Sequence, residues 1–214
     1  MGLCVWSEME ALKDEVFSSI YHESAQEKYV ALLLVRITDI CGDCMTLIAA
    51  NKSFSVPILL RSALESYIDL MCVISDPGHI EQMNSSFNGW MAKKFKDSDP
   101  LRSENFNKKV TRKGMKIWEK FQMVHEEATY KGFYAHLCRN SHGNIEMLVS
   151  EHAVNGMITV SGNPDLEKIK LLKNQTIGIV SKAMKEGLSF LKADQSTIDR
   201  FGEISELSGN GSYI

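Results

Sequence analysis

The chain lacks the sequence signatures of several common enzyme and membrane classes. It contains no glycine-rich phosphate-binding loop, no H-E-x-x-H, no G-x-S-x-G and no E-x-x-H pair. These absences argue against nucleoside triphosphate chemistry, zinc proteases, α/β-hydrolases and di-iron bundles. We therefore expect no metal and no cofactor. There is no signal-peptide pattern, and the longest apolar run near the start, Tyr29–Val35, is too short to cross a bilayer. We expect a cytoplasmic protein with no membrane partner.

The cysteines also do not form a pattern that indicates disulfides or a zinc site. The five cysteines are an odd number and fall mostly within apolar helical segments, which is typical of a reduced protein without a disulfide framework. Cys41 and Cys44 form the single C-x-x-C pair. No second pair follows at a zinc-site spacing, so we interpret both cysteines as packing residues.

Charge is distributed unevenly along the 214 residues. The formal net charge is −3, which does not favour a general nucleic-acid or membrane-surface binder. Residues 93–120, however, contain ten basic and four acidic residues. This basic segment includes Lys108, Lys109, Arg112 and Lys113, which we name as candidate contacts to an anionic ligand. A solvated helix face would explain the same pattern.

The spacing of apolar residues predicts an all-α protein. We expect an antiparallel helical bundle of about six or seven helices, with one small β-hairpin before the last helix. The expected helices cover residues 6–21, 24–51, 53–74, 79–96, 102–129, 130–141 and 165–192. The helix over 53–74 has the most apolar composition and is expected to lie in the core.

The hairpin is expected near residues 145–160, because apolar and polar residues alternate there and Asn155-Gly156 separates the two halves. We expect residues 1–192 to form one helical domain that includes this hairpin. The tail over 193–214 ends in a polar, glycine-containing stretch and is expected to be partly disordered.

Three charged residues interrupt the apolar helix over 53–74. Arg61, Glu65 and Asp69 lie at i, i+4 and i+8, so they form one polar stripe along it. Polar groups on so apolar a helix must be paired or face a cleft, because an unpaired buried charge is costly. Two interpretations remain open: an i,i+4 ion pair on an exposed edge, or Arg61 and Glu65 as substrate-binding residues in a cleft.

The densest set of reactive side chains lies between Tyr134 and Asn144. In a helix ending at Ser141, the side chains of His136, Arg139 and Asn140 share one face, and His142 follows close by. Gly143 suits the end of that helix, where cations also interact well with the helix dipole. The segment is therefore either a positively charged helix end or a phosphate-binding site.

Two short motifs carry a resemblance to known proteins. The stretches R-S-A-L-E-S-Y (Arg61–Tyr67) and L-C-R-N-S-H-G-N (Leu137–Asn144) resemble those of a group of bacterial helical proteins of unknown function. Arg139, Asn140 and His142 are more distantly similar to the arginine, polar residue and histidine of the HEPN superfamily, although arginine and histidine are closer together here. That superfamily includes metal-independent RNA-cleaving toxins and defence nucleases.

The HEPN resemblance implies a catalytic site and a ligand. His142 would move a proton at the scissile phosphate, Arg139 would stabilise the phosphoryl oxygens, and Asn140 would orient one of them. RNA or another anionic ligand would be the partner, with Arg61, Glu65, His136 and the basic segment as substrate-binding residues. HEPN sites commonly form where two copies meet, so a homodimer in bacterial or phage defence is implied.

A second interpretation gives the same residues no catalytic role. In a non-catalytic interaction or ligand-binding module, Arg61, Glu65, Arg139 and His142 would form a buried polar network that fixes helix packing.

Overall fold

The computed structural model describes residues 2–141, 149, 152–154, 157–158 and 166–209. Within them the protein is helical, as predicted. The helices in chain order are α1 (Gly2–Ser19), α2 (Ala25–Ala49), α3 (Val56–Ser75), α4 (Gly78–Phe95), α5 (Pro100–Asn107), α6 (Ile117–Met123), α7 (Glu127–Thr129), α8 (Ala135–Ser141), α10 (Leu166–Phe190) and α11 (Gln195–Gly209). A 3₁₀ turn, η1 (Ser53–Ser55), precedes α3, and a π-helical turn, η2 (Tyr130–Tyr134), precedes α8.

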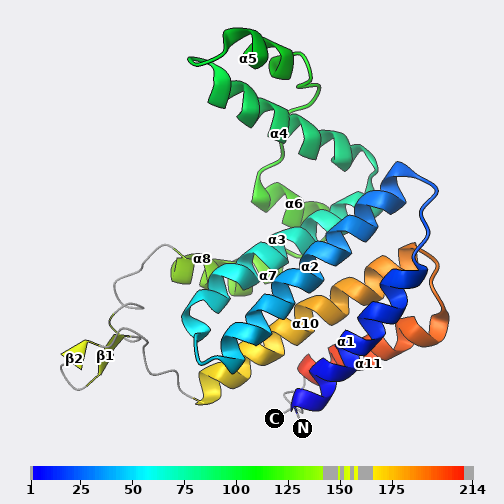
Figure 1. Ribbon diagram of the computed structural model, residues 1–214, viewed down its shortest axis with the longest axis vertical. Helices are drawn as coiled ribbons and strands as arrows, with labels where there is room; N and C mark the ends of the chain where they lie inside the picture. Colours follow the sequence, from blue (N-terminus) through cyan, green and yellow to red (C-terminus); the bar gives the residue numbers. More distant parts are fainter. Residues whose placement is uncertain (1, 142–148, 150–151, 155–156, 159–165, 210–214) are drawn as a thin grey trace.

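Helix α3 is the central helix of the bundle, as its composition predicted. Helices α2, α10, α8 and α6 all pack against it (Figure 1). Leu60 and Ile68 of α3 are completely buried. A Cβ atom at Gly187 of α10 would lie only 2.7 Å from Cδ1 of Leu34 on α2, so this glycine allows the two helices to approach closely. The close packing of α2, α3 and α10 forms the core.

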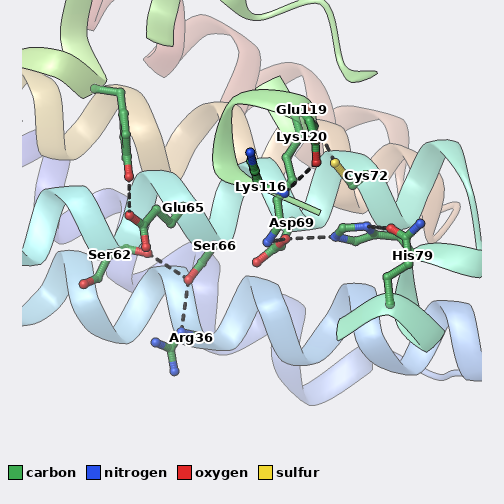
Figure 2. Close-up of polar contacts among 12 residues, drawn as sticks. Arg36, Ser62, Glu65, Ser66, Asp69, Cys72, His79, Lys116, Glu119 and Lys120 are labelled. Atoms are coloured by element: carbon green, nitrogen blue, oxygen red, sulfur yellow. Dashed lines mark hydrogen bonds and ion pairs between the residues drawn. The ribbon is translucent and has the colours of Figure 1, made fainter. Parts of the chain in front are cut away.

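Helix α2 begins where the sequence predicted. Ser24 caps it: the Ser24 hydroxyl accepts from the Glu27 backbone N–H at 3.1 Å, and the Glu27 carboxylate accepts from the Ser24 backbone N–H at 2.9 Å. These reciprocal bonds satisfy donors that a helix N-terminus leaves unpaired. Further along α2, Arg36 Nε donates to Ser66 Oγ on α3 at 3.0 Å, which links the two helices (Figure 2).

Helices α4 and α5 form an arm that extends away from the rest of the bundle (Figure 1). They pack mainly on each other, with the rings of Phe95 and Phe106 stacked at 6.1 Å. Arg102 covers the Phe95 ring, with its guanidinium carbon 4.0 Å from the ring centroid. Lys93, Lys94 and Arg102 of the basic segment lie on this arm.

The single helix expected over 102–129 is wrong, because the chain breaks it into α5, α6 and α7. A tertiary contact stabilises the irregular stretch after α5: Ser85 Oγ on α4 accepts from the backbone N–H groups of Thr111 and Arg112 at 3.1 and 3.2 Å. After α6, His125 has a left-handed backbone with φ 57°, which separates α6 from α7.

The expected hairpin is described only in part. Strands β1 (Ala153–Val154) and β2 (Met157–Ile158) pair antiparallel, with Ala153 opposite Ile158 and Val154 opposite Met157. Each strand has two residues, and the regular structure of the described residues is otherwise helical. The other residues of the expected hairpin, apart from 149 and 152, lie outside the described part of the chain, so its full extent stays a prediction.

The expected disordered tail requires a correction. Residues 195–209 form α11, which packs against α10. Ile198, Phe201 and Ile204 of α11 are buried in the core, and Phe201 is completely inaccessible. This apolar face stabilises the helix despite its polar surroundings. The last five residues lie outside the described part.

No helix among the described residues has the length and apolar character that a membrane crossing requires. Cys41 and Cys44 are both buried in the core of α2, in agreement with their predicted packing role. Burial raises the pKa of the Cys44 thiol to about 12, with a further contribution from the Asp43 carboxylate. Cys44 therefore stays a thiol at neutral pH.

Candidate functional site

Helix α8 carries the sequence-predicted catalytic face. His136 and Arg139 are exposed, and Asn140 is half-buried. The Asn140 side-chain amide donates to the backbone carbonyl of His136 at 2.9 Å. Within the described part of the chain no carboxylate forms an ion pair with Arg139. His142, the predicted proton-transfer residue, lies outside the described residues, so its distance from Arg139 stays untested.

Helix α8 packs against α3, and a polar cluster joins α3 to η2, the turn that precedes α8. We call Arg61, Glu65 and Tyr134 the edge cluster. Arg61 Nε donates to Glu65 Oε1 at 3.0 Å, and the Tyr134 hydroxyl donates to the same oxygen at 2.7 Å. The Arg61 guanidinium carbon lies 5.6 Å from the centroid of the Tyr134 ring. The predicted i,i+4 ion pair of Arg61 and Glu65 is therefore present, with a tyrosine as an additional partner.

The edge cluster is only partly shielded from water. The side chains of Arg61 and Glu65 are 28% and 37% exposed. Burial, followed by the hydrogen bond to Glu65, raises the pKa of Tyr134 well above its ordinary value, so its hydroxyl remains a donor. Burial would lower the pKa of Arg61, but its partners, Glu65 first, outweigh that effect and raise it. Arg61 is therefore a permanent cation beside α8.

A second polar cluster lies one helical turn further along α3, and our sequence analysis did not identify it. We call Asp69, His79 and Lys120 the buried cluster. Asp69 Oδ1 accepts from Lys120 Nζ at 2.6 Å and contacts His79 Nε2 at 2.9 Å (Figure 2). His79 Nδ1 lies 3.1 Å from Gln82 Oε1. The three members come from α3, α4 and α6, so the cluster ties the arm and α6 to the central helix.

The buried cluster is largely sequestered. His79 is 1% exposed, and the side chains of Asp69 and Lys120 are 18% and 19% exposed. Burial would raise the pKa of Asp69, but the hydrogen bonds from His79 and Lys120 outweigh it and hold this pKa below its ordinary value. Asp69 is therefore ionised, and its charge is balanced by Lys120. A cavity of about 210 Å³ adjoins the three side chains.

The predicted basic contacts lie on the chain that directly follows the arm. Lys108, Lys109, Arg112 and Lys113 are exposed. Lys108 pairs with Glu104 at 2.9 Å, and Arg112 Nε pairs with Glu81 at 3.0 Å. Figure 1 places this arm and α8 in separate parts of the molecule. The two predicted anion-binding regions therefore do not form one compact site.

The sequence analysis noted two residues of the buried cluster, but it gave no sign that they contact each other. Asp69 was recognised as part of the polar stripe, and Lys120 belongs to the basic segment. Their contact joins residues 51 positions apart, which periodicity cannot detect. Within the described residues no group of three or more histidine, cysteine, aspartate or glutamate side chains has an arrangement that could hold a metal ion.

The chain belongs to a family of unknown function, DUF5677, whose match covers residues 27–156. This range includes α3, α8 and both polar clusters. No curated protein and no solved structure shows a significant match. The expectation of an uncharacterised family is therefore confirmed, and only the residues of the site bear on function.

Proposed function

We propose that this DUF5677 chain is a HEPN-like protein that binds RNA at α8 and cleaves it without a metal. The observation that carries the proposal is the position of Arg139. It is exposed on α8 and forms no ion pair among the described residues, so its guanidinium is available to a phosphate. Among the predicted basic contacts, by contrast, Lys108 and Arg112 already pair with carboxylates.

Neighbouring groups support an anionic ligand at α8. His136 lies one turn before Arg139 on the same face and is also exposed. Arg61 of the edge cluster contributes a second guanidinium from α3, held in place by Glu65. Asn140 lies beside Arg139, and its amide oxygen remains available to accept from a ribose hydroxyl.

The proposed reaction uses the 2′-hydroxyl of RNA as the nucleophile. His142 accepts the proton of this hydroxyl, and the resulting oxygen attacks the adjacent phosphorus while the bond to the 5′-oxygen breaks. The 5′-oxygen leaves with a proton taken from water, and His142 later releases its own proton to water, giving a 2′,3′-cyclic phosphate and a 5′-hydroxyl. Arg139 stabilises the charge that develops on the phosphoryl oxygens, and Asn140 orients one of them. No metal ion is needed in this scheme.

The HEPN likeness also implies that two copies form the site together, so we propose a homodimer. Sedimentation at increasing protein concentration would test the association directly. Cleavage that rises with the second power of protein concentration in the dissociated range would link the dimer to the activity.

The decisive experiment incubates labelled single-stranded RNA with the protein and EDTA. Wild type should cleave the RNA, but it should leave a DNA strand of the same sequence intact because the 2′-hydroxyl is missing. Arg139→Ala and His142→Ala should abolish cleavage while circular dichroism shows intact folding. Lys28→Ala removes an exposed cation from α2 and serves as the matched control, with activity unchanged. Intact RNA with folded wild-type protein would exclude the nuclease.

A second candidate function is favoured by the edge cluster. Glu65 accepts from both Arg61 and Tyr134 through its Oε1 atom, so it fixes the contact between α3 and η2. Under this alternative the protein is a non-catalytic interaction or ligand-binding module. RNA binding that is lost in Arg139→Ala, without cleavage in any variant, would support a binding module. Neither binding nor cleavage would exclude both RNA roles.

A further inference from the structure

A separate cavity of about 370 Å³ lies between α3, the α7–η2 segment and α10. Its walls include Leu64 and Tyr67 from α3, Phe133 from η2, and Ile179 from α10. The volume falls within the range of small-molecule sites in proteins, about 300–1,000 Å³. The cavity uses none of the α8 residues in the RNA proposal, so the two sites can be tested independently.

The walls of the cavity are mainly apolar. Leu64 and Tyr67 are almost completely buried, at 2% and 3% exposed, so the inner wall belongs to the core. Two aromatic rings, Tyr67 and Phe133, line the space. Aromatic walls favour a flat ring as occupant, because stacked and edge-to-face contacts add to simple area burial.

The charged groups at the cavity neutralise each other. Lys182 Nζ donates to Glu126 Oε1 at 2.6 Å and lies 5.4 Å from the centroid of the Tyr67 ring. The Thr129 hydroxyl donates to the second Glu126 oxygen. Burial would raise the pKa of Glu126, but the hydrogen bonds from Lys182 and Thr129 hold it below its ordinary value. Because the ion pair is complete, an ionised occupant would lose hydration and gain no counter-charge.

One polar atom of the cavity lacks a partner. The Oδ1 atom of Asn174 on α10 is buried, and no group in the described part of the chain donates a hydrogen bond to it. Asn174 lines the cavity. A buried acceptor without a donor is costly, and such atoms are rare in folded proteins. A donor on a bound molecule would remove this cost once the Asn174 side chain turns the buried oxygen toward the cavity.

We propose that the cavity binds an uncharged aromatic small molecule whose single O–H or N–H group donates to Asn174 Oδ1. The aromatic walls hold the ring, and the neutral ion pair of Glu126 and Lys182 leaves no site for an ionised group. The volume excludes a folded partner such as a helix. The unpaired amide oxygen sets the orientation of the molecule.

Three probes with one ring system test each part of this proposal. 2-Naphthol has the ring and the donor, 2-methoxynaphthalene has the same ring with the donor capped, and 2-naphthoate is ionised. Saturation-transfer NMR and calorimetry on wild-type protein should give saturable binding of 2-naphthol. Its Kd should be about 3–10-fold lower than that of 2-methoxynaphthalene, the ratio expected for one hydrogen bond. 2-Naphthoate should bind more weakly than both.

Asn174→Leu removes the acceptor and should abolish the preference for 2-naphthol over 2-methoxynaphthalene. The readout is the ratio of the two affinities, which remains informative if the new side chain weakens both. Asn105→Leu on the arm is the matched control and should keep the wild-type ratio. Equal affinities in wild type, no saturable binding, or an unchanged ratio in Asn174→Leu would each overturn the proposal.

A side chain inserted from a second copy of the chain is the competing occupant. Sedimentation with and without 2-naphthol distinguishes the two. A sedimentation coefficient that does not change with the probe supports the small-molecule site. A dimer that 2-naphthol dissociates, and that Asn174→Leu also disrupts, would overturn it and assign the cavity to the partner copy.

Discussion

Glu65 and Asp69 are two carboxylates one helical turn apart on α3, yet they hold different parts of the molecule in different surroundings. Glu65 accepts from Arg61 on its own helix and from Tyr134, and its side chain is 37% exposed. Asp69 accepts from Lys120 on α6 and pairs with His79 on α4, and its side chain is 18% exposed. Only Asp69 brings together three helices.

Spacing within a helix does not determine how much a charged residue contributes to the stability of the fold. Water weakens a partly exposed ion pair, and such pairs usually contribute less than about 1 kcal/mol. A sequestered carboxylate interacts more strongly with its partners, and its removal leaves their charges without compensation. The stability of the bundle should therefore depend more on the buried cluster than on the edge cluster.

The largest expected effect comes from Asp69→Ala. It should lower the free energy of unfolding by about 3 kcal/mol, because the Lys120 ammonium and the His79 ring lose their shared acceptor at a site that is largely shielded from water. Glu65→Ala, one turn away, should cost about 1 kcal/mol, because Arg61 can turn toward water. Urea unfolding at pH 7 measures both. Equal losses, or a larger loss at Glu65, would contradict the comparison.

A smaller effect is expected on acidification. The folded pKa of Asp69 lies below its ordinary value. In the unfolded chain this pKa returns to about 3.9. The stabilisation is thus fully present above about pH 5 and is lost as the pH falls through the folded pKa. The difference in unfolding free energy between wild type and Asp69→Asn should shrink when urea unfolding is repeated from pH 5 down to pH 3. A constant difference would show that this carboxylate is not linked to folding.

The smallest expected effect concerns the edge cluster. Tyr134→Phe removes the hydroxyl that donates to Glu65 and keeps the ring, so it should cost about 1 kcal/mol. Tyr130→Phe is the matched control in the same turn, since the Tyr130 ring packs on Tyr134 but its hydroxyl forms no hydrogen bond with the described residues. Thermal unfolding should place Tyr130→Phe near wild type and Tyr134→Phe below it. The reverse order would show that the Tyr134 hydroxyl does not stabilise the edge cluster.

The parts of the fold that sequence predicted depend on local signals. The cap formed by Ser24 and Glu27 places the start of α2, and Pro57 in the first turn of α3 suits its start. The break after α5 could not be predicted in this way, since a hydroxyl from α4 stabilises it. Helix α11 was missed although Ile198, Phe201 and Ile204 repeat at helical spacing, because the polar, glycine-containing end dominated the interpretation.

The candidate site, too, was predictable only where its contacts are local in sequence. The i,i+4 spacing of Arg61 and Glu65 on one helix left their ion pair as one of two open interpretations, and the pair is present. Tyr134 joins them from a residue 69 positions away, and only the packing of α3 against η2 brings it there. The exposed face of α8 followed from helical periodicity. Periodicity did not indicate which helix α8 packs against. The position of His142 beside α8 stays a prediction.

The π-helical turn η2 has a consequence for the direction in which α8 presents its side chains. Such a turn holds one more residue than an α-helical turn, and each residue of a helix advances about 100° around the axis. Gly132 within η2 is exposed, and a Cβ atom there would meet nothing within 4 Å. The number of residues in this turn therefore sets the direction in which α8 presents its side chains. Loss of Gly132 alone would rotate Arg139 by more than a quarter of a circle while leaving every functional group present.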